Sequence, residues 1–287
     1  MAADTSTLAP TIQVVSPGTG STAAPNSIVD VQFNTALNPA TVNGTTIYLY
    51  DYYNGLNVPV TYSMPQPNVV RMVPTGNLQV NDYFFVEVTT GLQSSTSVPA
   101  NAVASWQDYF YTGNSIDTTL PTDVSAVPFN GATNVGVNVQ PGVVFSKAID
   151  PVSVNSNTFQ VTNAGTPLAG GFWISTDDTR VEFVPNAPLP TSTNLTMTLN
   201  GVLDQVGHPV SFSSQFQTGG GPDLVAPTIV QTSIPASGSI PVNSTITVQF
   251  SESMDVTSFS SSDFYVNDTV LGTPVPATLS WLSLIHI

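Results

Sequence analysis

The sequence repeats itself, and the length of the repeat limits what the chain can fold into. Three segments open alike, at Pro10, Pro121 and Pro227, and each continues into a short apolar strand. The period of about 110 residues is the size of one immunoglobulin-type sandwich. We therefore expect two complete units and the first part of a third.

Other positions recur inside each unit. An alternating strand ends in phenylalanine at Phe33, Phe145 and Phe250, and each complete unit closes with a Phe-x-Thr-Gly pattern at Phe110 and Phe216. A phenylalanine on the apolar side of a strand most simply anchors a core. Phe33, Phe145 and Phe250 are therefore predicted to be core anchors.

The strands alternate with a period of two. Val29, Val31 and Phe33 point one way and the residues between them point the other way, and no window of 12 residues sustains a helical pattern. Proline and glycine punctuate the chain at the spacing of sandwich turns. The pattern predicts an all-β fold of tandem immunoglobulin-like β-sandwiches with about seven strands each, the third unit being truncated.

The repeat also predicts the domain bounds, which are 1–113, 114–220 and a partial third domain over 221–281. Residues 282–287 resemble the translation of a sequencing adapter and are expected to lie outside the fold. Half a sandwich leaves an apolar sheet face uncovered, so the third unit is predicted to be poorly stable in isolation. The linker containing Gly219, Gly220 and Gly221 is predicted to flex more than the linker before Pro121.

The charge balance excludes some partners. Charged residues make up 7% of the chain, and three basic residues face 18 acidic ones, which gives a net charge of −15. Phosphate backbones and anionic lipids are bound by clustered lysine and arginine, so neither nucleic acid nor an anionic membrane surface is an expected partner. No apolar stretch is long enough to insert into a membrane.

The residues of common catalytic sites are also missing. The chain has no cysteine, which removes disulfides, thiolate zinc sites and cysteine nucleophiles. His208 is the one histidine before the tail, and it lies in a Gly-His-Pro turn. Asp177 and Asp178 are expected in a solvated hairpin turn rather than in a glycosidase cleft, which needs two carboxylates and aromatic walls. We expect no catalytic residues and no enzyme activity.

Calcium is the one cofactor that the sequence suggests. Asp117 and Asp123 flank the first linker and Asp223 lies in the second, and linker carboxylates can hold calcium between stacked β-domains. These three residues are candidate metal ligands. The alternative is that they are ordinary solvated acids.

An aromatic stretch in the first unit suggests a ligand. Tyr48, Tyr50 and Tyr52 alternate onto one face, expected to be the outer face, and aligned tyrosines can stack on sugars. The alternative is packing at a sheet edge or an interface. Tyr62 and Trp173 occupy matching places in the two units and are expected to be buried between the sheets, with a sugar platform as the alternative.

Several stretches resemble a known family. They are VPFNGATNV at 127–135, IPVNSTITVQFSESMD at 240–255 and the Asp-Gly turn DQVGHP at 204–209, and they resemble the bacterial Ig-like domain of the SbsA type found in S-layer proteins. Unit one departs from the family pattern at the place of this Asp-Gly turn, where residues 91–108 are expected to form a longer loop. The resemblance implies a sandwich fold, and function only as a class.

The resulting hypothesis is a non-catalytic structural spacer of a bacterial cell-surface or secreted protein, located outside the cell. Its expected partners are the other Ig-like domains of the same chain and cell-wall or extracellular glycans. Two alternatives remain: an adhesin or carbohydrate-binding module, and an accessory region of an exported hydrolase.

Overall fold

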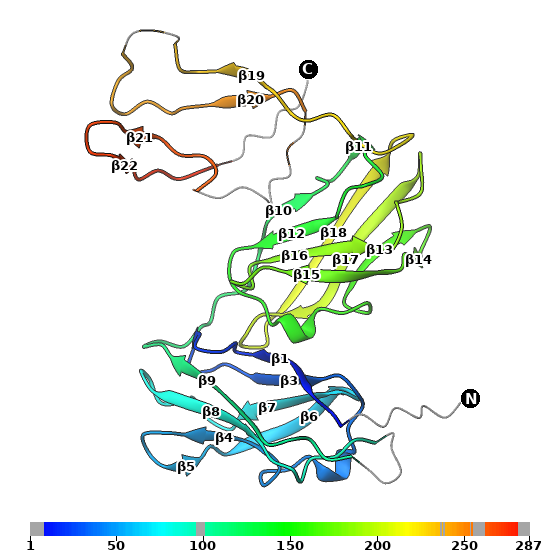
Figure 1. Ribbon diagram of the computed structural model, residues 1–287, viewed down its shortest axis with the longest axis vertical. Helices are drawn as coiled ribbons and strands as arrows, with labels where there is room; N and C mark the ends of the chain where they lie inside the picture. The colour runs from blue at the N-terminus through cyan, green and yellow to red at the C-terminus, as the bar shows by residue number, and fades with distance from the viewer. Residues whose placement is uncertain are drawn as a thin grey trace.

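The computed structural model describes residues 9–95, 101–235, 237, 239–252, 254 and 262–280. Within these ranges the regular structure is β-sheet, and the helical segments are two single 3₁₀ turns, η1 (Pro39–Thr41) and η2 (Pro151–Ser153). No described helix has the length and apolar character needed to cross a membrane. The predicted all-β class is confirmed, and Figure 1 shows two complete sandwiches followed by a smaller third part.

Unit one consists of two facing sheets. The four-stranded sheet has the order β1 (Ile12–Ser16), β3 (Val29–Phe33), β7 (Val69–Pro74), β6 (Val60–Gln66). The five-stranded sheet has the order β2 (Thr22–Ala23), β9 (Trp106–Thr112), β8 (Tyr83–Val88), β4 (Ile47–Asp51), β5 (Leu56–Asn57). Neighbours are antiparallel except β2 and β9, which are parallel.

Unit two repeats this arrangement. Its four-stranded sheet has the order β10 (Asp123–Val127), β12 (Gly142–Phe145), β16 (Arg180–Pro185), β15 (Gly170–Ile174). Its five-stranded sheet has the order β11 (Ala132–Val135), β18 (Pro209–Thr218), β17 (Asn194–Leu203), β13 (Phe159–Asn163), β14 (Thr166–Pro167). Because the strand orders match, each position of unit one has a structural equivalent in unit two.

The strand number differs slightly from the prediction. The described sheets of each unit have four and five strands, against about seven expected. The difference lies in two-residue pairings such as β2, β5 and β14, which are too short to produce an alternating pattern in the sequence.

The core lies between the two sheets of each unit, as the alternation predicts. Phe33 and Phe110 are fully buried in unit one, and Phe145 and Phe216 are buried in unit two. Each belongs to a hydrophobic cluster that the inward-facing residues of both sheets form. Burying a side chain of this size contributes about 1.5–3 kcal/mol, so these anchors account for much of the drive to form the sandwich.

The third part has two separate two-stranded sheets, formed by β19 (Ile229–Thr232) with β20 (Val248–Phe250) and by β21 (Asn267–Asp268) with β22 (Thr273–Pro274). No described residue from 221 to 280 is buried. Phe250, expected as a core anchor, is only half-buried, and the two small sheets described in this part enclose no buried residue. Trp281 and the tail 282–287 lie outside the described residues.

Candidate functional site

The first candidate site lies where unit two meets unit one. Asp30 on β3 and Arg71 on β7 are cross-strand neighbours on the outer face of the four-stranded sheet. The Arg71 Nε donates to both carboxylate oxygens of Asp30, at 2.8 and 3.1 Å, and Nη2 also donates to Asp30. The Asp30 side chain is fully buried and that of Arg71 is mostly buried, which is unusual for an outward-facing pair.

Unit two covers this pair with the 3₁₀ turn η2, which lies against β1 and β3 (Figure 1). Asp150 caps the turn, and its Oδ1 accepts a hydrogen bond of 3.0 Å from the backbone N of Val152. Its Oδ2 lies 3.5 Å from Nη2 of Arg71. The guanidinium of Arg71 therefore contacts two fully buried carboxylates, one from each unit.

The carboxylates of Asp30 and Asp150 differ in how many hydrogen bonds they accept. Asp30 holds Arg71 through several hydrogen bonds, whereas Oδ2 of Asp150 receives no hydrogen bond from a described donor. Burial raises the pKa of Asp150 well above its ordinary value, and the nearby charge of Asp30 raises it further. Protonation of Asp150 therefore stabilises this buried group, because it removes one of two neighbouring negative charges.

A second ion-paired cluster holds the linker against the same end of unit two. Nζ of Lys147 lies 2.6 Å from Oδ2 of the fully buried Asp204, also pairs with the linker residue Asp117, and donates to the carbonyl of Thr119 at 3.0 Å. Partial burial acts to raise the pKa of Asp117, but hydrogen bonds from Lys147 and Thr119 outweigh it and lower that pKa to about 2. Asp117 is therefore ionised throughout the physiological range.

Hydrogen bonds between the units complete the junction. The side chain of Asn26 in unit one accepts from the backbone N of Asp117 at 2.9 Å and donates to its carbonyl at 2.7 Å. The backbone N of Ile28 donates to the carbonyl of Gln205 at 3.0 Å. Gln205 belongs to the Asp-Gly turn that carried the family resemblance, so this turn forms part of the contact with unit one.

Asp204 also organises that turn. Its Oδ1 accepts from the backbone N of Val206 at 3.0 Å and of His208 at 2.8 Å. Nδ1 of His208 lies 3.0 Å from Oδ2 of Asp204. His208 therefore takes part in the turn, as its Gly-His-Pro setting predicted.

The repeat provides an internal comparison for the junction. In unit two the positions equivalent to Asp30 and Arg71 are Gly142 and Glu182, since both pairs face each other across the same two strands. The acid–base pair that unit one presents to its follower is thus absent from the matching face of unit two.

The other side of the junction is equally specific. In unit one the positions equivalent to Lys147, Asp150 and Asp204 carry neutral residues, namely Thr35, Asn38 and Ser94. The charged groups of both units therefore occur where these two units meet. They belong to this joint rather than to the sandwich fold.

The candidate calcium ligands are distributed as follows. The carboxylate of Asp117 is held by Lys147, and the exposed Asp223 is bonded through its backbone to the side chain of Asn138, at 2.9 Å in both directions. Asp117 precedes β10 and Asp223 follows β18, and the segments that join unit two to its neighbours lie at its opposite ends (Figure 1). Asp123 begins β10, and its side chain lies outside the described part of the chain. Among the described residues no group of three acidic or histidine side chains converges as a metal site, and calcium binding stays a prediction.

The second candidate site is the outer face of the five-stranded sheet of unit one. Tyr48 and Tyr50 lie on this face, opposite the buried Ile47 and Leu49. Tyr52 follows the strand, and its ring lies 5.5 Å from that of Tyr83. The three predicted tyrosines are therefore on the outside of one sheet.

The structure adds aromatic residues that sequence reasoning missed. Cross-strand pairing places Tyr50, Phe85 and Tyr109 in one row, and Tyr83 and Tyr111 in the next. Most of the rings meet edge to face at centroid distances of 4.7–6.4 Å, and Tyr83 stacks on Tyr111 at 4.9 Å. We call this surface the aromatic face; its residues are Tyr50, Tyr52, Tyr83, Phe85, Tyr109 and Tyr111.

The aromatic face is accessible to solvent. Tyr52 is 54% exposed and Tyr111 is 44% exposed, and the other four rings are half-buried by their neighbours. Partial desolvation and the surrounding phenols and Asp108 raise the pKa of Tyr83 above its ordinary value of 10.0. Its hydroxyl is therefore a hydrogen-bond donor at neutral pH.

Unit two again provides the comparison. The register-matched residues on its five-stranded sheet are all polar: Thr162, Asn194, Thr196, Gln215 and Gln217. The same sandwich thus forms with no aromatic ring on this face. The rings of unit one are not a requirement of the fold.

One prediction about aromatic residues is wrong. Tyr62 is half-buried and donates to the carbonyl of Ile47 at 2.8 Å, but its register equivalent in unit two is Phe172, not Trp173. Trp173 is 42% exposed with Arg180 over its ring at 4.5 Å. A slip of one residue along a strand moves a side chain to the opposite face of the sheet.

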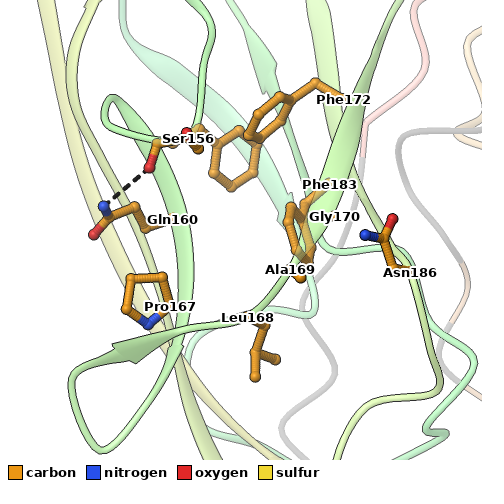
Figure 2. A pocket seen from close by; sticks show the side chains of 10 residues that line it. Ser156, Gln160, Pro167, Leu168, Ala169, Gly170, Phe172, Phe183 and Asn186 are labelled. Atoms are coloured by element: carbon orange, nitrogen blue, oxygen red, sulfur yellow. Dashed lines mark hydrogen bonds between the residues drawn. The ribbon is translucent and has the colours of Figure 1, made fainter. Parts of the chain in front are cut away.

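A hollow in unit two holds no catalytic arrangement. Figure 2 shows this hollow of about 180 Å³, which is lined by apolar residues such as Leu168, Phe172 and Phe183 and by no titratable side chain. The adjacent acids Asp177 and Asp178 lie elsewhere, in a turn where Ser175 Oγ donates to Asp177 Oδ1 at 2.6 Å. Neither place combines a nucleophile, an acid and a cleft.

Comparison with known proteins agrees with this architecture. The model of the bacterial Ig-like domain family matches residues 6–112, 117–218 and 223–285. The chain belongs to this family. The predicted family membership is confirmed, and the narrower SbsA type stays a prediction.

Solved structures with similarity to this bacterial Ig-like chain are distant. CopC from Methylosinus trichosporium OB3b is 16% identical with a TM-score of 0.29, and the match covers 38% of this chain and 99% of CopC. The N-terminal part of the bacterial S-layer protein SbsC is 12% identical with a TM-score of 0.31, over 73% of this chain and 44% of that one. The titin domains z1z2 are 12% identical with a TM-score of 0.25, over 75% and 98%. No curated protein matches the chain.

Proposed function

We propose that this chain is a non-catalytic structural spacer of a bacterial cell-surface or secreted protein, in which the first two Ig-like units act as one stiff segment. The observation that carries the proposal is the junction. Arg71 contacts one buried carboxylate from each of the two units. Lys147 pairs with Asp117 of the linker and with Asp204 of unit two, and so holds the linker against unit two. The joint resists bending, because bending would break the hydrogen bonds of Asn26 with Asp117 and of Ile28 with Gln205 and would uncover the Asp30–Arg71 pair on which η2 lies.

The second joint lacks these groups. The face of unit two that corresponds to Asp30 and Arg71 carries Gly142 and Glu182, and the residue of unit three that corresponds to Lys147 is Glu252. Burial and the like charge of the linker residue Asp223 raise the pKa of Glu252, and the glycine run 219–221 precedes this joint. A stiff first joint followed by a looser second one suits a spacer that must extend and still adapt at one hinge.

The hydrogen-bond partners of the buried acidic residues support a non-catalytic role. In the described parts of units one and two, the most buried carboxylates hold arginine, lysine or backbone donors within the fold and line no cavity. Location outside the cell follows from the same proposal, since Ig-like spacers of this family are expected to carry other domains away from an anchor.

Force spectroscopy on single molecules tests the spacer role. The chain has no cysteine, so one cysteine added at each end gives unique attachment points. Units one and two should resist force and unfold separately, each releasing about 30 nm, which is the length of about 100 extended residues less the folded span. A Phe145→Asp variant, which destroys the core of unit two, should lose one of the two events.

The result that contradicts the proposal is extension without resistance. A chain that lengthens smoothly, like an unfolded polymer, could not hold domains apart under load.

A further inference from the structure

In the part of the chain that the structure describes, no other element packs over the exposed rings of the aromatic face, and the spacer role does not use it. Six aromatic residues from three adjacent strands and the following turn lie side by side on the outside of unit one. At the same positions unit two has threonine, asparagine and glutamine, which is the ordinary composition for a solvated sheet face. An exposed cluster of this kind marks a binding surface.

We propose that the aromatic face of unit one binds a neutral, extended polysaccharide chain. The rings provide apolar surfaces on which the C–H faces of sugar rings can pack, and the phenol hydroxyls provide hydrogen bonds beside them. This proposal is independent of the spacer function, because it rests on a different face of the unit.

The charge of the surroundings restricts the ligand. The three basic residues of the chain are Arg71, Lys147 and Arg180, and they are engaged at the junction or over Trp173, away from this face. An anionic polymer would therefore meet no countercharge. A second copy of the chain also carries a net charge of −15, which opposes self-association through this surface.

The acidic residues bordering the face are already engaged. Glu87 is hydrogen-bonded to Gln107 across the strands, and Asp51 accepts from the backbone and side chain of Asn54 at 2.9 and 2.8 Å. Asp108 is buried and accepts from Thr19 at 2.7 Å. Their charges are partly satisfied, so the rings, rather than free carboxylates, dominate what a ligand meets.

The form of the site favours a polymer. The face is the outside of a sheet rather than a pocket, and its rings are held against one another by edge-to-face packing. A hollow of about 290 Å³ adjoins the turn that carries Tyr52 and Tyr53, since its lining residues Asp51 and Asn54 flank them in the sequence. Half of its lining is polar, namely Asp51, Asn54, Asn57, Asn77 and Gln79, and the other half is apolar. Amides next to aromatic surfaces provide the hydrogen-bond donors and acceptors that sugar hydroxyls require.

Affinity electrophoresis of the full chain tests the proposal. Native gels would contain one neutral polysaccharide each, from a set of hydroxyethylcellulose, β-1,3-glucan, xylan, mannan and dextran. We expect at least one of them to retard the chain in a concentration-dependent way. Retardation by none of them overturns the proposal, and so does binding to poly-L-lysine without binding to any neutral polymer, which would assign the face to a cationic partner.

The repeat supplies the decisive variant. Tyr83→Asn, Phe85→Thr, Tyr109→Gln and Tyr111→Gln together give unit one the residues that unit two has at the same register positions, so the sandwich should still form. We expect binding to weaken at least about tenfold while the far-ultraviolet circular dichroism and the unfolding midpoint of unit two stay unchanged.

The matched control removes an exposed aromatic ring from another face. Trp173→Ala should leave binding unchanged, because Trp173 lies on the four-stranded sheet of unit two. Binding that survives the fourfold variant, or that is lost equally in Trp173→Ala, contradicts the assignment to the aromatic face.

Discussion

The buried Asp150 predicts an unusual result, namely a stabilising substitution at a domain junction. Asp150→Asn removes a carboxyl whose pKa is raised by burial and by the charge of Asp30. The cap of η2 should survive the change, because Asn38 occupies the matching position in unit one and its Oδ1 accepts from the backbone N of Ala40 at 3.1 Å. The variant therefore changes the charge and keeps the local geometry.

The size of the effect follows from two opposing contributions. The variant loses the attraction between Asp150 and Arg71, a contact of 3.5 Å in which Oδ2 of Asp150 accepts no hydrogen bond from a described donor. It gains the free energy otherwise needed to ionise a buried carboxyl beside Asp30. We expect a net stabilisation of about 1–3 kcal/mol at pH 8.

The pH dependence gives the sharper test. A carboxyl with a raised pKa in the folded state contributes stability that is complete below its unfolded-state pKa of about 4 and is lost as pH rises through the raised value. The wild-type chain should thus lose this contribution on going from pH 4 to pH 8, and the Asn variant should not. The difference between the two proteins should grow with pH and nearly vanish at pH 4.

Urea unfolding at pH 4, 6 and 8, followed by tryptophan fluorescence and circular dichroism, measures this difference. The control is Asn38→Asp, which places the same carboxylate on the cap of unit one, where no other unit buries it, and should change stability little at any pH. An Asp150→Asn variant that is less stable than wild type at pH 8, or that differs by the same amount at every pH, would refute this reasoning.

Three further results are expected. Lys147→Met leaves the buried Asp204 without the lysine that pairs with it and should lower the free energy of unfolding in urea by about 3 kcal/mol. A change below about 0.5 kcal/mol would show that the Lys147–Asp204 ion pair does not stabilise the chain. Burial and then Asp177 raise the pKa of Asp178 to about 6, so its protonation contributes stability that is present below pH 4 and lost as pH rises through 6. Asp178→Asn should therefore raise the thermal midpoint at pH 7 but not at pH 4, and equal shifts would argue against it. In an isolated fragment of residues 221–281, the amides from 229 to 279 should exchange rapidly with deuterated water, and protection throughout that range would show that the third unit folds alone.

The fold could be predicted from the sequence because its signal is local. Strands such as Val29–Phe33 alternate with a period of two, and the same alternation recurs one domain length later. An error of one residue was still enough to pair Tyr62 with Trp173 instead of Phe172, since the sequence contains no direct record of which residues face each other across strands.

The junction could not be predicted in the same way. Asp30, Arg71 and Asp150 come from three distant segments, and their meeting depends on how two domains pack. A partial signal did exist: each of the three basic residues has a neutral or acidic equivalent in the other unit, namely Glu182 for Arg71, Thr35 for Lys147 and Val69 for Arg180. A position-by-position comparison of the repeats would have marked all three as specific to one unit, and two of them lie at the joint.

The aromatic face was predicted only in part for a similar reason. Tyr48, Tyr50 and Tyr52 are close in sequence and their alternation is visible, whereas Tyr83 and Tyr109 join them only through strand pairing. The third unit could be placed by its repeat pattern, but its sheets remain uncovered because the partners that would bury them are absent from the described residues.

The stiffness of the first joint is tested most directly by the distribution of distances between two spin labels, one in each unit. Labels on cysteines introduced at the exposed positions Thr75 and Asn200 would be unique, because the chain has no cysteine of its own. Double electron–electron resonance should give a narrow distribution for this pair, and the Arg71→Met, Lys147→Met double variant should broaden it markedly. A wild-type distribution as broad as that of the variant would contradict the claim that the contacts of the junction hold the two units as one body.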